Sequence, residues 1–186
     1  MGFDKLLYGF LQLDRLVYQW VHTVQIPWLI NIMLIITYMG FSVTFLILSA
    51  LISVYLLFER RLWETMFLNA SLYTAWALMG LLKNWFERSR PAGEALTVAG
   101  GYSFPSGHAM LAMAFYGFLA SLLIHSGSRW GRIGAGLLYI LIILIAFSRI
   151  YLNVHYLSDV LAGLLFGSIC LIVSLKAMKK VQSGKY

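Results

Sequence analysis

Charged residues are scarce in this sequence: Asp, Glu, Lys and Arg make up 11% of its 186 residues, whereas 61% are hydrophobic. A soluble domain has roughly 25% charged and 45–50% apolar residues. The mean hydropathy of +0.80 points in the same direction. A water-soluble globule of this composition would expose large apolar patches and aggregate. The composition therefore excludes a soluble protein and predicts an integral membrane protein, with one membrane-embedded domain over residues 1–186.

Cysteine and clustered basic residues are lacking as well. Cys170 is the single cysteine, which excludes a disulfide framework and a thiolate metal cluster. The fourteen Lys and Arg residues give a net charge of +7, but they are scattered and form no basic stripe, so nucleic acid is not an expected partner. Charged residues interrupt the first fifteen positions, so we expect no cleavable signal peptide.

Long stretches without charge alternate with short charged segments. An apolar helix of about 18–20 residues crosses the hydrocarbon core of a bilayer. With a few flanking polar residues, the uncharged stretches predict spans near 41–58, 64–83, 106–125, 132–151 and 156–176. The predicted fold class is all-α: a polytopic transmembrane helix bundle of five spans, or six if the residues before 41 contribute one more.

The N-terminal region has a different pattern. Residues 3–24 place apolar residues at helical spacing with polar residues between them, which indicates an amphipathic helix in the membrane interface. Pro27 then breaks this helix, so we assign residues 1–27 as an interfacial amphipathic segment. Residues 28–39 are apolar but too short to span. They form either a re-entrant half-helix or the tilted start of a long helix that runs to Phe58.

The distribution of cations predicts the orientation. With five spans, eight Lys and Arg residues fall on the face that holds the C-terminus and six fall on the other face. Because cytoplasmic loops carry the excess of positive charge, we expect a cytoplasmic C-terminus. Residues 83–105 and 149–155 then lie on the outer face. In the last span, Gly163 and Gly167 form a small-xxx-small pair, which predicts close helix packing.

Three clusters of polar residues lie at ends of the predicted spans. They are Lys83 with Arg90-Pro91, Pro105-Ser106-Gly107-His108, and Ser148-Arg149 with His155 and Asp159. The chain crosses the membrane through 106–125 and returns through 132–151. All three clusters are therefore expected on one face, whatever the path of the N-terminal region.

The cations of these clusters suit an anion with several oxygens. Lys83, Arg90 and Arg149 supply three positive charges, and arginine forks match phosphate geometry in particular. Ser106 and Gly107 begin a helix, whose free N–H groups and dipole favour a phosphate, and Gly107 permits close approach. Snorkelling to the interface would explain any one cation at a span end. It does not explain three beside a helix that opens with Ser-Gly-His.

The histidines add acid–base chemistry. His155 and Asp159 are four residues apart, so on a helix they would share a face, and the carboxylate would leave one ring nitrogen free as nucleophile or base. His108, on another helix, would approach the phosphate from elsewhere, so one of the two histidines could attack phosphorus while the other protonates the leaving oxygen. His22 and His125 have no partner at useful spacing and are expected to be ordinary polar residues. No metal is expected, because a third ligand is lacking and nearby cations would repel a divalent ion.

The pattern Lys83-x6-Arg90-Pro91, Pro105-Ser106-Gly107-His108 and Ser148-Arg149-x5-His155-x3-Asp159 resembles the signature of the type 2 phosphatidic acid phosphatase (PAP2) superfamily. The resemblance implies a phosphatase that needs no metal or other cofactor, with its catalytic motifs within 83–159. By it, His155 is the nucleophile, Asp159 orients it, and His108 is the acid for the leaving group and then the base for water. The implied phosphate ligands are Lys83, Arg90, Ser106, Gly107 and Arg149.

The resemblance also implies a substrate and a location. The chain is similar to small bacterial phosphatidylglycerophosphate phosphatases and undecaprenyl pyrophosphate phosphatases, so the expected partners are a lipid phosphate and the bilayer. We expect hydrolysis of a phosphomonoester such as phosphatidylglycerophosphate or phosphatidic acid, with undecaprenyl pyrophosphate as the alternative. The expected location is the cell membrane, with several crossings and an extracytoplasmic active site. A transporter would carry charges along a path through the bilayer, whereas here they lie at or near span ends.

Overall fold

The computed structural model describes the backbone of residues 2–184 and the side chains of residues 11–184. Within this part of the chain every regular element is an α-helix, as predicted. The helices are α1 (Gly2–Val24), α2 (Pro27–Tyr38), α3 (Ser42–Phe58), α4 (Leu62–Phe86), α5 (Gly107–His125), α6 (Arg129–Tyr151) and α7 (Leu157–Ser183). Helices satisfy their own backbone hydrogen bonds, which is what a segment surrounded by lipid requires.

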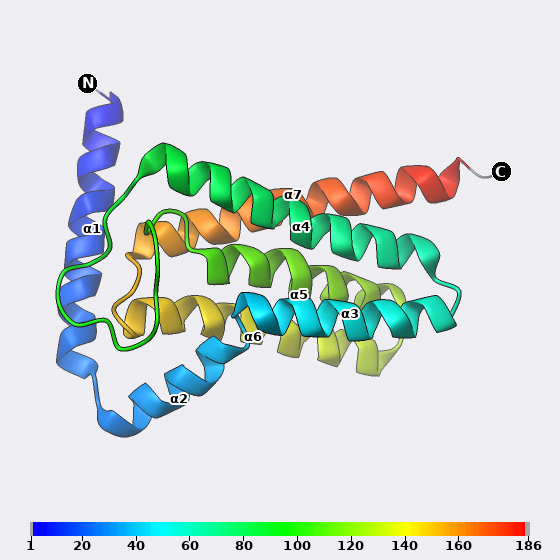
Figure 1. The fold of residues 1–186 in the computed structure, drawn as a ribbon, viewed down its shortest axis with the longest axis horizontal. Coiled ribbons are helices and arrows are strands. Elements are labelled where there is room, and N and C mark those ends of the chain that lie inside the picture. Colours follow the sequence, from blue (N-terminus) through cyan, green and yellow to red (C-terminus); the bar gives the residue numbers. More distant parts are fainter. Residues whose placement is uncertain (1, 185–186) are drawn as a thin grey trace.

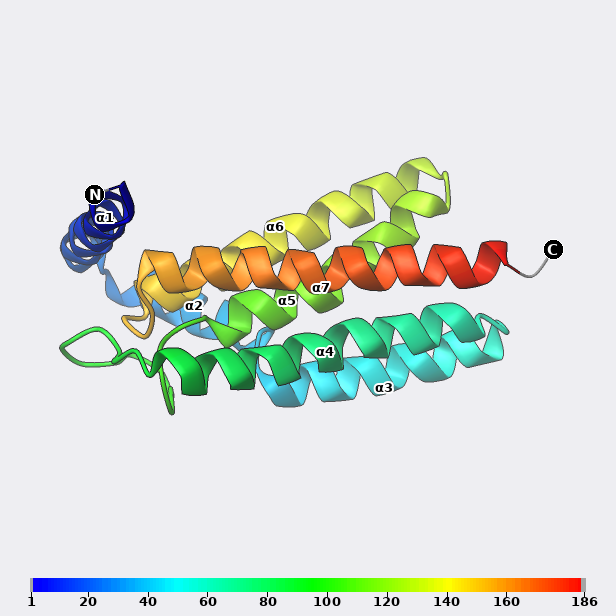
Figure 2. The same cartoon turned by 90° about the horizontal axis from the view of Figure 1, so that it is seen from above.

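Helices α3 to α7 run alongside one another as a bundle (Figures 1 and 2). Helix α5 lies at its centre and packs against α4, α6 and α7. Its Phe115 and Phe118 are fully buried, whereas the outer helices keep many large apolar side chains exposed, such as Leu137 and Leu165. Apolar side chains on the outside of a bundle are stable only in lipid, so the packing agrees with a membrane protein.

Four helices, α4 to α7, are each long and apolar enough to cross a membrane. Helices α2 and α3 pass the same test only as a pair, and they meet at an angle of 47°. The region from 27 to 58 is therefore a bent pair and not one continuous helix. The bend lies at Gly40, where a Cβ would approach the His108 Cδ2 and Ile145 Cγ2 atoms to 2.7 Å each. Glycine fits at this crowded position because it has no side chain.

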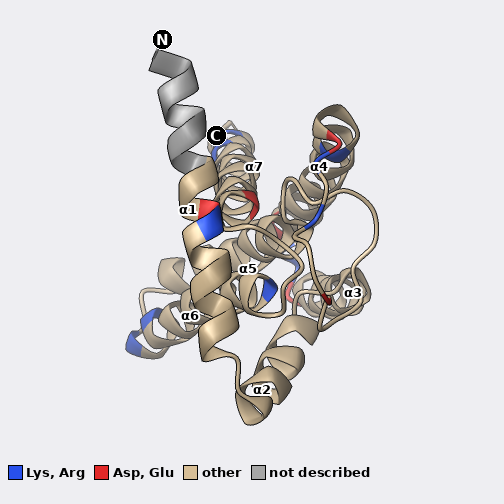
Figure 3. Ribbon diagram, turned by 90° about the vertical axis from the view of Figure 1, so that its left-hand side faces the viewer, with Lys and Arg blue, Asp and Glu red and all other residues tan. Residues whose placement is uncertain are grey.

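Helix α1 runs crosswise over one end of the bundle (Figures 1 and 3). This confirms a helix over residues 3–24; the side chains of residues 1–10, which belong to the predicted amphipathic pattern, lie outside the described part. Val21 packs into an apolar cluster with Ile150 and Tyr151. Leu16 and Trp20 remain more than half exposed, at 61% and 52%. An apolar surface of this kind suits the membrane interface.

Close packing between α5 and α7 brings two motif segments together. A Cβ at Gly163 would come within 2.5 Å of the Ser106 carbonyl oxygen, and one at Gly167 would collide with the Met110 carbonyl. Both glycines thus face the backbone of α5, which confirms the predicted close contact. As a result, the Ser106 N–H donates to the Asp159 carbonyl at 2.9 Å, and the start of α5 lies against the start of α7.

The segment between α4 and α5, residues 87–106, contains no helix and lies at the same end as α1 (Figure 1). It is tied to the turn between α6 and α7. The Leu96 N–H donates to the Leu152 carbonyl at 3.1 Å, and the Asn153 amide donates to the Glu94 carbonyl at 3.0 Å. This loop and that turn together form the end of the molecule where the motifs meet.

Candidate active site

The structure brings the three motif clusters to one end of the bundle. Lys83 lies in the last turn of α4, and Arg90 follows in the loop. Gly107 and His108 open α5, with Ser106 as its N-cap. Arg149 lies in the last turn of α6, His155 lies in the turn that follows this helix, and Asp159 lies in the first turn of α7. Segments far apart in the sequence therefore contribute to one site.

A cavity of about 260 Å³ lies between these segments. The motif residues that line it are Lys83, Arg90, Gly107, His108, Arg149 and His155. None of the described residues that line it is a carboxylate. Ser106 is fully buried and does not line the cavity. The cavity therefore combines three cations and two imidazoles with no negative charge on its wall.

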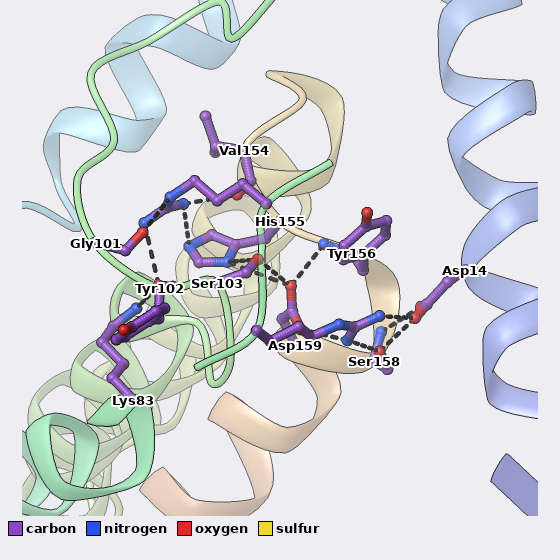
Figure 4. A network of polar contacts seen from close by, with 12 residues as sticks. Asp14, Lys83, Gly101, Tyr102, Ser103, Val154, His155, Tyr156, Ser158 and Asp159 are labelled. Atoms are coloured by element: carbon purple, nitrogen blue, oxygen red, sulfur yellow. Dashed lines mark hydrogen bonds and ion pairs between the residues drawn. The ribbon is translucent and has the colours of Figure 1, made fainter. Parts of the chain in front are cut away.

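His155 is 4% exposed and presents its two ring nitrogens to different surroundings. Its Nε2 lies 3.4 Å from an Arg90 guanidinium nitrogen, and its Nδ1 lies 3.3 Å from Ser103 Oγ (Figure 4). Burial lowers the pKa of His155 to about 4; the Asp159 carboxylate opposes this shift, and the charges of Arg149 and Arg90 add to it. The ring is therefore neutral at pH 7, which leaves a lone pair on one nitrogen.

The link between His155 and Asp159 differs from the expected one. Helix α7 begins at Leu157, so His155 precedes the helix, and its Nδ1 lies 3.6 Å from Asp159 Oδ2, which is too far for a hydrogen bond. Ser103 fills this gap by donating from its hydroxyl to Asp159 Oδ2 at 2.5 Å. The physical reason is the helix end: Asp159 accepts the Tyr156 N–H at 2.9 Å and so caps α7.

The other oxygen of Asp159 is held by a residue that the sequence motifs do not include. Arg88 donates to Asp159 Oδ1 at 2.6 Å and to Asp14 Oδ2, on α1, at 2.7 Å (Figure 4). It also donates to Ser158 Oγ at 2.7 Å, and its guanidinium lies 4.2 Å from the centre of the Tyr156 ring. Arg88 thus connects two carboxylates on different helices.

Arg90 lines the cavity and also bonds to the loop between α4 and α5 and to the turn after α6. Its guanidinium donates to the carbonyls of Gly100 at 2.7 Å, Gly101 at 3.0 Å and Val154 at 2.7 Å. Burial lowers the pKa of Arg90, and the charge of Asp159 partly opposes this. Lys83 is likewise a donor to the Tyr102 carbonyl. Both cations face the cavity while they hold the loop in place.

Arg149 is 1% exposed and reaches the cavity from α6. It donates to the hydroxyl of Thr37, on α2, at 2.6 Å, and its Nε has no partner among the described residues. The same holds for His108 Nε2 and Ser106 Oγ. Buried polar groups are nearly always paired. Two of these unpaired groups belong to residues that line the cavity, Arg149 and His108, and they indicate a place for a ligand with several acceptors.

The bend between α2 and α3 forms a wall of this cavity. Gly40, Phe41 and Ser42 line it, and the Phe41 ring meets the His108 ring edge to face with centroids 5.0 Å apart. The sequence allowed two paths for the region around Phe41, and the structure shows that this region packs directly on His108.

Sequence reasoning missed Ser103, Arg88, Asp14 and Thr37. The sequence does contain a signal for Thr37, because Thr37 and Asn31 are the two polar residues of an otherwise apolar helix. The sequence signal for Asp14 is weaker: Asp14 is a carboxylate between Leu13 and Arg15 on the predicted amphipathic helix. The partners of Ser103 and Arg88 are brought together by the fold, and no spacing in the sequence indicates them.

The remaining histidines behave as ordinary polar residues, as expected. His125 Nδ1 lies 2.7 Å from the Ser121 carbonyl one turn earlier, and the His22 ring packs on Tyr18 with centroids 4.5 Å apart. Within the described residues, no three His, Cys, Asp or Glu side chains are grouped so that they could hold a metal ion.

A family model of the PAP2 superfamily matches residues 64–183, which include all three clusters. The chain belongs to the PAP2 superfamily. It is 34% identical over 147 residues to phosphatidylglycerophosphatase B of Bacillus subtilis (strain 168), covering 76% of this chain and 71% of that protein. It is 39% identical over 108 residues to a putative undecaprenyl-diphosphatase of Escherichia coli (strain K12), covering 55% and 48%.

Solved structures agree with this PAP2 assignment. The transmembrane PAP2-type phosphatidylglycerolphosphate phosphatase from Bacillus subtilis matches with a TM-score of 0.85 and 29% identity, over 90% of this chain and 85% of that one. LpxE of Aquifex aeolicus matches with a TM-score of 0.71 and 27% identity, over 89% and 94%. The protein is a membrane-embedded PAP2 phosphatase, and its activity is the hydrolysis of a phosphoric ester.

Proposed function

We propose that this PAP2 protein removes the phosphomonoester of a membrane lipid, such as phosphatidylglycerophosphate or phosphatidic acid, through a phosphohistidine on His155. The observation that carries this proposal is the cavity: three cations and two histidines surround it, and no described lining residue is a carboxylate. A phosphate with several acceptor oxygens would compensate these charges and pair the unsatisfied groups.

In the first step, Nε2 of neutral His155 attacks phosphorus, and the bond from phosphorus to the lipid oxygen breaks. Ser103 and Asp159 lie on the Nδ1 side and hold the ring so that Nε2 faces the cavity. His108, which enters the cavity from α5, gives its proton to the leaving oxygen. The negative charge of the bound phosphate favours the protonated form of His108.

In the second step, water attacks phosphorus and the P–N bond breaks. Neutral His108 takes a proton from this water, so inorganic phosphate leaves and both histidines return to their starting states. The charge that develops on the phosphoryl oxygens in both steps is stabilised by the fixed cations and by the N-terminus of α5.

The choice of a monoester rests on the number of free cations. A diphosphate such as undecaprenyl pyrophosphate would bring a second charged phosphate to the mouth of the site. Arg88 is a further cation of the loop between α4 and α5, but Asp14 and Asp159 neutralise its charge. The name of the Bacillus subtilis relative supports the monoester, and that of the Escherichia coli relative supports the diphosphate.

The test is a comparison of kcat/KM for phosphatidylglycerophosphate, phosphatidic acid and undecaprenyl pyrophosphate in one detergent, with a soluble phosphate ester as control. We expect the lipid monoesters to be the best substrates and the soluble ester to be poor, because tail binding positions the head group. A clear preference for undecaprenyl pyrophosphate would favour the second function. Inactivity on every lipid would contradict both.

We also propose that the site faces the outside of the cell, since the order of the spans in the sequence assigns eight of the fourteen Lys and Arg residues to the C-terminal face. In a background with Cys170 replaced by serine, Ala95→Cys should react with an impermeant thiol reagent on intact cells. Arg129→Cys, at the opposite end of the bundle, should not. The reverse labelling pattern would place the site in the cytoplasm.

The proposed reaction uses no metal, because side-chain cations supply the positive charge. Activity should therefore survive EDTA, and vanadate should inhibit as an analogue of the five-coordinate transition state. Loss of activity in EDTA that magnesium restores would contradict this part of the proposal.

A further inference from the structure

Resting on the proposed function, we propose that Asp14 and Arg88 are positioning residues for the His155 nucleophile, and that α1 is therefore part of the catalytic framework and not only a membrane anchor. The two side chains form the end of a chain of contacts that passes through Asp159 and Ser103 to the imidazole (Figure 4).

The geometry of Arg88 is that of a bridge. Its NH1 donates to Asp159 Oδ1 at 2.6 Å, and its NH2 donates to Asp14 Oδ2 at 2.7 Å. A planar guanidinium held at both nitrogens fixes the position of each carboxylate. Because Arg88 holds Oδ1, the Asp159 carboxylate cannot rotate, and its Oδ2 stays directed at Ser103 and the Tyr156 N–H.

Asp14 is a buried partner of Arg88 and Ser158 and not an exposed surface charge. It is 4% exposed, although Leu13 and Leu16 beside it are 50% and 61% exposed. Its carboxylate accepts the Ser158 N–H at 2.8 Å and the Ser158 hydroxyl at 2.6 Å. Ser158 lies in the first turn of α7, so Asp14 satisfies a free N–H at the same helix end that Asp159 caps. A buried carboxylate is stable only with such partners.

Two other roles fit the observations less well. If α1 were only an anchor, nothing would require a buried carboxylate on its inner side. If Arg88 bound the substrate phosphate, it should line the cavity of the cations, and it does not. Its guanidinium is also occupied by two carboxylates, which would repel a phosphate. Positioning of Asp159 accounts for both residues.

The test begins with Asp14→Asn, which keeps the shape and an acceptor but removes the charge. Arg15→Gln is the matched control, because Arg15 is the next residue on α1 and is exposed. We expect Asp14→Asn to lower kcat by about 5- to 10-fold with KM unchanged, since the effect reaches catalysis through another residue. Single-turnover formation of phosphohistidine should slow by the same factor. Arg15→Gln should leave both rates as in the wild type.

Arg88→Gln should have the larger effect, a fall in kcat of about 10- to 100-fold, the range found when a residue that orients a metal-binding side chain is replaced. Arg88→Lys keeps the charge but cannot bridge two carboxylates with a fork, so its kcat should lie between those of Arg88→Gln and the wild type. The double variant Asp14→Asn/Arg88→Gln should be no slower than Arg88→Gln alone, because Asp14 acts through Arg88.

Several results would overturn the proposal. They are an unchanged kcat in Asp14→Asn, a rise in KM at constant kcat, or effects that multiply in the double variant. Thermal midpoints in detergent show which variants fold. If Arg88→Gln does not fold, the comparison of Asp14→Asn with Arg15→Gln decides alone. A wild-type protein that is inactive on all lipid phosphates would instead contradict the proposed function.

Discussion

The two sides of the His155 ring differ in charge. On the Nε2 side, the cavity carries Lys83, Arg90 and Arg149 with no carboxylate among its described lining residues. On the Nδ1 side, beyond Ser103, the charges of Arg88, Asp14 and Asp159 are paired at 2.6 and 2.7 Å. His155 thus lies between a region of uncompensated positive charge and a region in which the charged side chains form ion pairs.

This difference indicates what each region does. Uncompensated cations attract an anion and gain free energy when it binds. A paired network attracts no ligand, but removal of one member leaves a buried charge without its partner and is costly. Substitutions on the cavity side should therefore affect binding and catalysis directly, whereas those on the other side should act through geometry.

The largest loss of activity is expected at His155, which lies between the two regions. His155→Ala should lower kcat by about 10⁴-fold or more, because the covalent route is lost with the nucleophile. Substrate labelled with radioactive phosphorus should leave acid-labile label on the wild type and none on the variant. Substantial turnover by a folded His155→Ala protein would show that another group attacks phosphorus.

On the cavity side, Arg149→Gln should lower kcat/KM by about 10²- to 10³-fold, the range found for loss of one preorganised donor. Its Nε is unpaired among the described residues, so it has a donor free for the substrate. Arg132→Gln, an exposed change at the opposite end of the same helix, is the control. Equal activity of both variants would contradict a role for Arg149 in phosphate binding.

A change in helix spacing should disturb both sides through geometry. Gly163→Ala places a Cβ 2.5 Å from the Ser106 carbonyl, so α7 must move away from α5. We expect a loss of about 1–3 kcal/mol in stability, as for other overpacked sites, together with a lower kcat. A Cβ at Gly136, on α6, would meet open space, so Gly136→Ala should keep both the stability and the kcat of the wild type. Thermal melting and kcat of the two variants, measured in one detergent, test this contrast.

The smallest expected effect concerns the titration of His155, which should not become protonated between pH 8 and pH 5. Since burial lowers the pKa of His155 to about 4, the ring stays neutral when pH falls from 8 to 5. An ordinary histidine of pKa about 6.5 would be roughly 97% protonated at pH 5. NMR of protein with labelled histidines should show one resonance, absent in His155→Gln, that does not shift over this range. A midpoint between pH 6 and 7 for that resonance would contradict the buried neutral ring.

The membrane spans could be predicted because long uncharged stretches are a strong signal. The predicted spans 64–83 and 106–125 correspond to α4 and α5, and the bounds differ by at most three residues. The last helix is longer than predicted, ending at Ser183 and not at 176, because Lys residues end the apolar stretch but not the helix. The bend at Gly40 could not be predicted, since it follows from packing against His108 and Ile145.

For the site, the motif residues lie at one end of the bundle, as their spacing predicts, and six of them line the cavity, whereas Ser106 and Asp159 do not. The role of each residue stays a prediction. Spacing failed where geometry depends on a helix end. The sequence suggested that His155 and Asp159 share a helix, whereas α7 begins between them and Ser103 makes the connection. Arg88 and Asp14 are 74 residues apart, and only the fold shows that they pair.

The hydrogen bonds of Arg90 to Gly100, Gly101 and Val154 have a consequence for the rate of binding. They order the long segment between α4 and α5 before any substrate arrives. Ordering a residue costs about 1–2 kcal/mol in conformational entropy, and here that loss occurs during folding. A substrate thus meets a loop that these bonds already hold in place, and we expect its association to need no ordering of this segment.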